Sequence, residues 1–170
     1  MRTLPSFSAA FSLLLLCLFP STARCGSFDY SGESIGALKL GMTEDKLASA
    51  LPDAKPPRRG PVKLFGADGL YHQTWTFSGA GVELDLASAS PTGLKTVEAI
   101  TISSPCKFQT SREIGIGTPA AQALKAYKAA YNKQESKPGE SLVFGSVFGG
   151  LIISVKDGKV SGLFLGAAAE

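Results

Sequence analysis

Few residues of this chain have the types and spacing that enzyme chemistry requires. Its 170 residues include one histidine, His72, and no Gly-x-Ser-x-Gly motif of the kind that exposes a catalytic serine. Glu44 and Asp45 are adjacent acids, but at an expected helix start they complement the helix dipole instead of acting as an acid/base pair. Ser146 lies in an apolar run without a histidine in its half of the chain. The sequence therefore predicts a protein that is not an enzyme.

No metal ion or organic cofactor is expected. The spacing of the histidine, cysteine and carboxylate residues fits no metal site. The segment Gly115-Ile116-Gly117 has two glycines of a dinucleotide-binding loop but lacks the third.

The single histidine lies in a stretch that alternates like a strand. Alternation places His72 and Thr74 on one face and Tyr71, Gln73 and Trp75 on the other, with Trp75 in the core. Three roles stay open for His72. It is a solvated strand residue, a contact residue that acts with Tyr71 on a protein partner, or a zinc ligand or catalytic base.

A polar segment in the middle of the chain, Ser103–Glu113, has the groups that could dock in a catalytic cleft. Pro105 stiffens it, and a stiff segment loses less entropy on docking. A plain linker is the alternative. The residues expected to contact a partner are Lys107, Phe108, Gln109, Thr110, Ser111 and Arg112, together with Tyr71 and His72.

A second segment, Pro52–Pro61, is rich in proline and basic residues. Lys55, Arg58 and Arg59 give it a positive charge. It is either a rigid, solvated linker or an electrostatic patch that steers an acidic partner.

An export signal precedes these segments. Arg2 gives a basic start, Phe11–Phe19 forms an apolar run, and small residues end at Ala23, so residues 1–23 are expected to be a signal peptide. The run is shorter than the roughly 20 residues that span a bilayer. Cys25 lacks the preceding aliphatic and small residues of a lipid-modification motif. We expect an exported, periplasmic protein without a permanent membrane span.

Export also affects the cysteines and the charge. Cys25 and Cys106 remain after cleavage, and an oxidising compartment favours a disulfide between them, with two free thiols as the alternative.

The signal peptide carries one of the 17 basic residues, Arg2, so the remaining basic residues exceed the 14 acidic ones by two. A nucleic acid partner is therefore not expected.

One pattern occurs twice along the chain. Leu38–Leu51 and Ile114–Tyr127 each read as a strand end, a glycine turn at Gly41 or Gly117, and the start of an amphipathic helix. Alternating apolar residues then predict about three antiparallel strands in each copy.

The strand segments correspond as well. Trp75–Leu86 matches Phe144–Val155, Thr96–Ile102 matches Lys159–Leu165, and Asp157-Gly158 is a strong hairpin signal. We predict an α+β fold of two tandem helix-plus-antiparallel-sheet repeats in one domain. Its parts are an N-terminal segment (24–35), the first repeat (36–104), and the connector with the second repeat (105–170).

The phrase Leu-x-x-Gly-Met-Thr at the first helix start, followed by a strand with Trp75-x-Phe77, resembles the small envelope domains of the BamE/SmpA type. Two such units in tandem resemble the architecture of the β-lactamase inhibitor protein. That resemblance implies a concave sheet surface that grips an enzyme.

Two functions are consistent with these observations. The first is a periplasmic inhibitor, an immunity protein that occludes the active site of a secreted peptidoglycan-cleaving toxin. Its partner would be a secreted or periplasmic cell-wall hydrolase. The alternative is a non-catalytic envelope assembly or structural binding protein of the BamE-like type.

Overall fold

The computed structural model describes residues 28–168. The expected signal peptide, residues 1–23, and Cys25 lie outside the described residues. Within residues 28–168, no helix is both long enough and apolar enough to cross a membrane.

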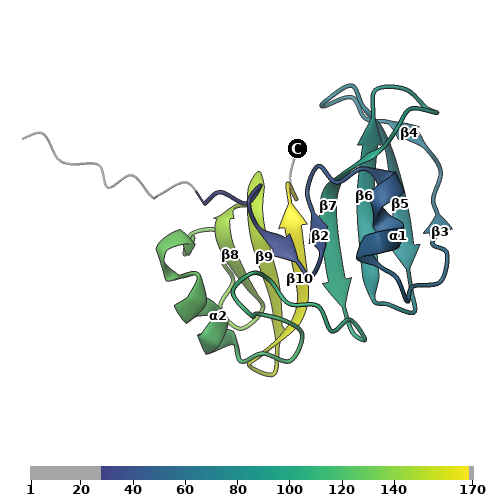
Figure 1. Ribbon diagram of the computed structural model, residues 1–170. Helices are drawn as coiled ribbons and strands as arrows, with labels where there is room; N and C mark the ends of the chain where they lie inside the picture. Colours follow the sequence, from purple (N-terminus) through teal and green to yellow (C-terminus); the bar gives the residue numbers. More distant parts are fainter. Residues whose placement is uncertain (1–27, 169–170) are drawn as a thin grey trace, which may run out of the picture.

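The described chain folds mainly into antiparallel strands (Figure 1). The strands are β1 (Ser34–Ile35), β2 (Leu38–Lys39), β3 (Arg58–Arg59), β4 (Lys63–Leu64), β5 (Tyr71–Phe77), β6 (Val82–Ser88), β7 (Thr96–Ser103), β8 (Ser141–Ser146), β9 (Gly149–Lys156) and β10 (Lys159–Gly166). The α-helices are α1 (Leu47–Ala50) and α2 (Ala120–Ala126), and the 3-10 turns are η1 (Glu44–Lys46) and η2 (Lys128–Ala130).

One sheet of eight strands contains all but β1 and β2, in the order β3-β5-β6-β7-β10-β9-β8, with β4 also pairing with β5. The two halves of the chain meet where β7 pairs with β10. Leu163 lies opposite Ile102 and Leu165 opposite Ile100. Residues opposite each other in a ladder share a face, so these four buried side chains lie on one side of the sheet. A single core therefore crosses the junction.

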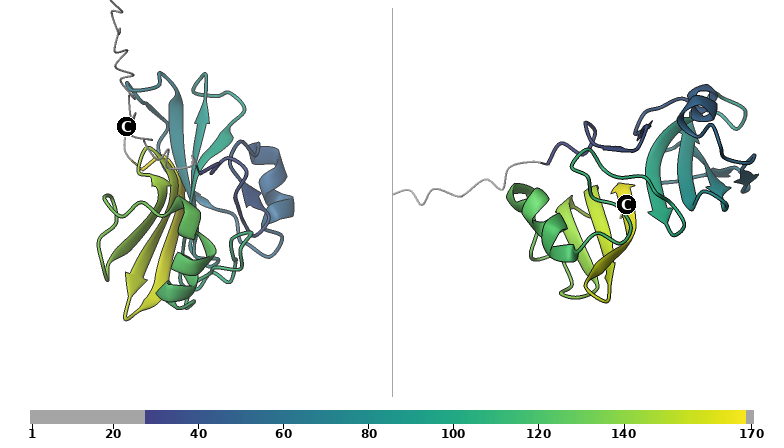
Figure 2. Two further views of the ribbon diagram at one scale, coloured as in Figure 1. Left: turned by 90° about the vertical axis from the view of Figure 1, so that its left-hand side faces the viewer. Right: turned by 60° about the horizontal axis from the view of Figure 1, so that its bottom comes forward.

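Both α-helices lie on this same side of the sheet (Figure 2). Leu47 of α1 belongs to the core cluster that includes Trp75. Tyr127, directly after α2, places its ring 5.1 Å from that of Phe144. Within residues 28–168 the other face carries no helix. It presents polar side chains that include those of Thr74, Thr76, Glu83, Thr101 and Ser154.

The expected α+β fold of tandem helix-plus-sheet repeats is wrong. Strands make up 42% and helices 12% of the structure, which makes it a β-rich fold. α1 has four residues and α2 seven, and helices this short are marginal without tertiary support. The apolar stripe of the first helix consists of Leu47 and Leu51, and Pro52 follows at once and prevents its extension. Strands of seven or eight residues supply most of the core instead.

Three local predictions are confirmed. Gly41 and Gly117 have φ angles of 72° and 86°, the left-handed region that glycine adopts without a steric cost. Asp157 and Gly158, with φ of 52° and 71°, form the turn between β9 and β10. Trp75 is buried in the core, with 5% of its surface exposed.

Candidate functional site

The connector, residues 105–115, lies at the end of the sheet where β7 finishes (Figure 1). Hydrogen bonds hold its backbone from two directions. The Gly36 N–H donates to the Gln109 carbonyl at 2.8 Å, and the Thr110 N–H donates to the Ile114 carbonyl at 2.9 Å. These bonds tie the connector to the N-terminal segment and close it into a tight turn.

Glu33 fixes the connector from the protein interior. It is 4% exposed, and its carboxylate accepts hydrogen bonds from the Ser111 N–H at 2.9 Å and from the Tyr127 hydroxyl at 3.0 Å. Burial raises the pKa of Glu33, but the hydrogen bonds together outweigh it and leave the pKa below its ordinary value. A charged, buried carboxylate therefore links the N-terminal segment, the connector and the end of α2.

The connector presents some of the predicted contact side chains to solvent and buries others. Lys107, Gln109 and Ser111 are exposed. Phe108 is half-buried, with its ring against the N-terminal segment. Thr110 is buried, and its hydroxyl accepts hydrogen bonds from two connector N–H groups. The Thr110 side chain therefore holds the turn of the connector and is not available to a partner.

Arg112 is exposed, but its side chain is tied to α2. The guanidinium donates to the Ala126 carbonyl at 2.5 Å and lies over the Tyr127 ring, 4.6 Å from its centroid. A cation at a helix C-terminus interacts favourably with the helix dipole and with unpaired carbonyls. The Arg112 side chain therefore stabilises the position of the connector against the end of α2.

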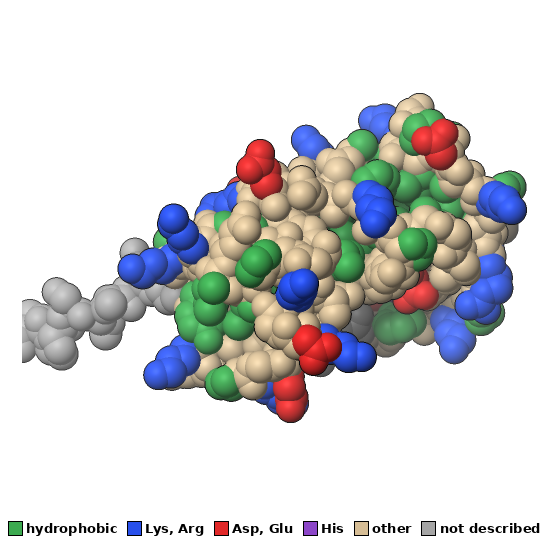
Figure 3. All heavy atoms as spheres, turned by 90° about the horizontal axis from the view of Figure 1, so that it is seen from below, with side chains coloured by type: hydrophobic (Ala, Val, Ile, Leu, Met, Phe, Trp, Pro, Cys, Tyr) green, Lys and Arg blue, Asp and Glu red, His purple; other side chains and the backbone are tan. Residues whose placement is uncertain are grey.

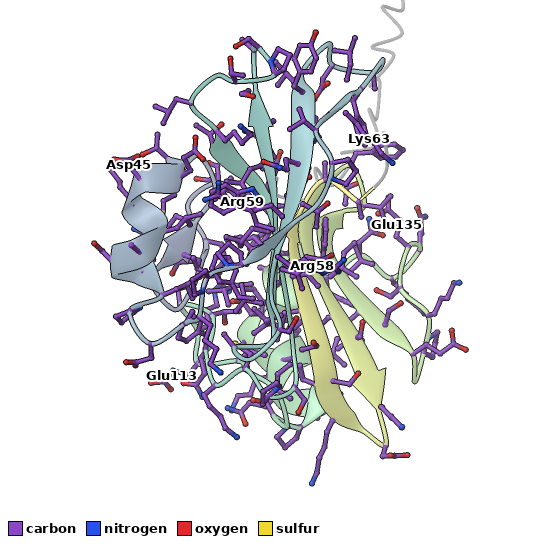
Figure 4. All side chains as sticks on the ribbon, turned by 90° about the vertical axis from the view of Figure 1, so that its right-hand side faces the viewer. Asp45, Arg58, Arg59, Lys63, Glu113 and Glu135 are labelled. Carbon is purple, nitrogen blue, oxygen red and sulfur yellow. The ribbon has the colours of Figure 1, made fainter. Side chains whose placement is uncertain are left out.

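The structure does not bring Tyr71 and His72 to the connector. Both begin β5, whereas the connector lies beside the turn that follows Phe77. The strand between Tyr71 and Phe77 spans about 20 Å. Lys63, which pairs with His72, lies near the upper end in Figure 4, and Glu113 of the connector lies in the lower part. The predicted contact residues thus fall into two separate places.

His72 is an ion-paired residue, so its interpretation as a solvated strand residue is wrong. It is 7% exposed, with Nδ1 2.5 Å from an Asp85 oxygen and Nε2 2.8 Å from an Asp68 oxygen. Burial lowers the pKa of His72, but the two carboxylates together raise it above its ordinary value. Both ring nitrogens are engaged, which leaves neither for a substrate or a metal ion. In residues 28–168, no group of three or more His, Cys, Asp or Glu residues could hold a metal ion.

The basic segment Pro52–Pro61 forms part of the sheet edge and is not a free linker. Arg58 and Arg59 make up β3 and pair with β5. Arg59 lies over the Trp75 ring at 4.0 Å on the helix side, and Arg58 points to the other face (Figure 4). Prolines and charged side chains on an edge strand hinder pairing with another chain. This edge is therefore protected against strand addition.

A cleft beside the connector was not predicted from the sequence. This connector cleft has a volume of about 650 Å³ and lies between the end of α1, the β5–β6 turn and the start of the connector. Its floor, the buried part of the lining, consists of Ala50, Leu51 and Cys106. Viewed from this end, Lys and Arg side chains are spread among small hydrophobic patches (Figure 3). Its walls come from segments far apart in the chain, so no local pattern indicates it.

The opposite end of the sheet carries exposed apolar side chains. They lie on the segments around β4 and on the β6–β7 and β8–β9 turns, away from the connector. Phe148 follows β8, five strand spacings of about 4.8 Å from β5, so these side chains share one end of the sheet without forming one continuous patch. This apolar end consists of Val62, Leu64, Phe65, Leu94 and Phe148.

The predicted disulfide stays a prediction. Cys106 is 5% exposed, and burial raises the pKa of its thiol. Cys25 lies outside the described residues. Phe28, three residues after it, lies beside Gly145 at the end of the sheet away from Cys106.

No protein-family model, characterised protein or solved structure gives a significant match to this chain. The connector, the connector cleft and the apolar end are the surface features of residues 28–168 that bear on its function.

Proposed function

We propose that this chain is an exported, non-enzymatic protein that inhibits a secreted or periplasmic enzyme by placing its connector in the active-site cleft of that enzyme. One observation carries the proposal. The backbone of the connector is fixed by hydrogen bonds while the side chains of Lys107, Gln109 and Ser111 are exposed. A segment that is already ordered loses little conformational entropy when it docks.

The exposed groups suit the active site of a cell-wall hydrolase. Enzymes that cleave glycosidic bonds use a pair of carboxylates. The Lys107 ammonium can pair with such a carboxylate, and the Gln109 amide and Ser111 hydroxyl can donate hydrogen bonds to it. In this role the chain acts as an immunity protein against a peptidoglycan-cleaving toxin.

Capture followed by inhibition tests this function. The chain without residues 1–23 is immobilised and exposed to envelope and secreted proteins, and any captured hydrolase is assayed with the free inhibitor. Lys107→Ala combined with Gln109→Ala should weaken inhibition by about 2 kcal/mol, close to thirtyfold in Kd. The control combines Lys133→Ala and Gln134→Ala, the same residue types exposed far from the connector. Equal inhibition by both double variants would refute the role of the connector.

The apolar end favours a second candidate, a non-catalytic envelope assembly protein. Leu64, Leu94 and Phe148 are 60%, 64% and 67% exposed, and they lie at the end opposite the connector. Leu64→Ser with Leu94→Ser should abolish capture of an assembly partner and leave the capture of a hydrolase unchanged. Loss of hydrolase capture with this variant would instead favour one shared binding surface.

A further inference from the structure

The connector cleft has the size and lining of a small-molecule site. Its volume of about 650 Å³ lies within the range of roughly 300–1,000 Å³ that such sites occupy. Small side chains create the space: Ala50 is buried on the floor, and Ala54 and Ala80 are half-buried lining residues. Pro105 and the Phe108 ring add apolar surface from the connector. The interior can therefore accept an apolar body of several carbon atoms.

The buried side chain of Cys106 keeps the floor apolar, either as a thiol or in the predicted disulfide with Cys25. It is 5% exposed and lies among the lining residues with Leu51. Burial raises the pKa of the free thiol, so it is uncharged at neutral pH, and a disulfide carries no charge either. The floor residues therefore carry no side-chain group that needs a hydrogen bond from a ligand.

The charged residues of the cleft are at its exposed mouth. Lys55 comes from the loop after α1 and Lys107 from the connector, and both are exposed. Asp53 is the one acidic residue that lines the same cleft. Two ammonium groups and one carboxylate give the opening of the cleft a net positive charge, whereas its floor is apolar.

We propose that the connector cleft binds a small amphiphilic anion, a medium-chain aliphatic carboxylate whose chain lies over Ala50 and Cys106 and whose carboxylate pairs with Lys55 and Lys107. This inference does not depend on the inhibitor function. Because Lys107 and Phe108 also belong to the connector, a bound carboxylate would compete for the side chain that we assign to enzyme contact.

Titration with dodecanoate below its micelle concentration tests the site. The probe is added to the chain without residues 1–23, and binding is followed by calorimetry and by amide NMR shifts. We expect one saturable site, with shifts concentrated at Ala50, Ala80 and Phe108. Non-saturable binding, or shifts concentrated at the apolar end, would overturn the proposal.

Two sets of variants separate the charged mouth from the apolar floor. Lys55→Gln with Lys107→Gln should weaken dodecanoate binding about tenfold, because two partly exposed ion pairs are lost. Lys125→Gln with Lys133→Gln, at exposed positions outside the cleft, should leave it unchanged. Dodecanol should bind the unmodified chain more weakly than dodecanoate. Equal binding of the alcohol and the acid would overturn the assigned role of the lysines.

A cavity-filling variant tests the floor independently. Ala54→Phe places a ring in the cleft from a half-buried loop position, and it should abolish binding while the circular dichroism spectrum stays unchanged. A folded Ala54→Phe protein that binds dodecanoate with unchanged affinity would place the ligand elsewhere and refute the site.

Discussion

Replacing Glu33 with alanine should loosen the connector and destabilise the whole fold. The Glu33 carboxylate is the acceptor for the Ser111 N–H, for the Tyr127 hydroxyl and for the Ser34 N–H. Glu33→Ala leaves all three donors without this acceptor. Tyr127 is fully buried, so solvent cannot replace the lost partner of its hydroxyl without a rearrangement.

The magnitude follows from those groups. A buried donor left without a partner costs about 1–3 kcal/mol. The Tyr127 hydroxyl keeps a neighbour in the Thr110 side chain, which reduces its share, and Ser111 lies near solvent. We therefore expect Glu33→Ala to lower the free energy of unfolding by about 3 kcal/mol. Tyr127→Phe, which removes a single donor, should lower it by about 1 kcal/mol.

The effect also has a pH signature. The folded-state pKa of Glu33 is lowered, so its contribution is fully present above the unfolded value, near 4.5, and is lost as the pH falls through the folded value. The cost of Glu33→Ala should therefore shrink in acid.

Urea denaturation at neutral and acidic pH measures both effects. Amide hydrogen exchange at Ser111 reports the connector directly. Glu140→Ala changes an exposed glutamate on a loop and should stay within about 0.5 kcal/mol of the unmodified chain. If Glu33→Ala matches this control and the protection of Ser111 is unchanged, the carboxylate does not hold the connector.

Three further predictions concern the core, the ion-paired histidine and the cysteines. Trp75→Ala should cost about 3–5 kcal/mol as a large-to-small core change, and an unchanged melting temperature would contradict its burial. The pKa of folded His72 is raised from 6.5, so its ion pairs stabilise the fold fully below pH 6.5 and this stabilisation is lost as the pH rises through the folded value. His72→Gln should remove that part of the pH dependence of stability. Alkylation of the denatured, unreduced chain should label neither Cys25 nor Cys106 if they are bridged, and two labels would exclude the disulfide.

Local patterns in the sequence predicted the turns and the buried strands well. The turns at Gly41, Gly117 and Asp157-Gly158 can be predicted from the backbone preferences of the residues that form them. The burial of Trp75 can be predicted from the period-two alternation of its strand. The sequence predicts more helix than forms, because an apolar stripe indicates an amphipathic helix but does not specify its length. The first helical turn is the 3-10 turn η1, and α1 ends before Pro52.

The geometry of the site depends on contacts that no local pattern contains. Glu33 reaches Tyr127 across 94 residues of the chain, and His72 reaches Asp85 across a strand pair. The separation of Tyr71 from the connector follows from strand direction, which period-two alternation does not specify. The connector cleft likewise needs three distant segments to meet.

The pairing of β7 with β10 has a consequence for how the chain matures. One edge of β7 pairs with β6, which directly precedes it in the sequence. The other edge stays unpaired until Lys159–Gly166 has been synthesised and has folded against it. Until then the main-chain donors and acceptors near Ile100 and Ile102 are open to any extended segment, including one from a second copy. Until β10 pairs with β7, the partly folded chain is therefore prone to aggregation. A chaperone that shields β7 should raise the yield of soluble protein, and a chain that stops before Lys159 should aggregate.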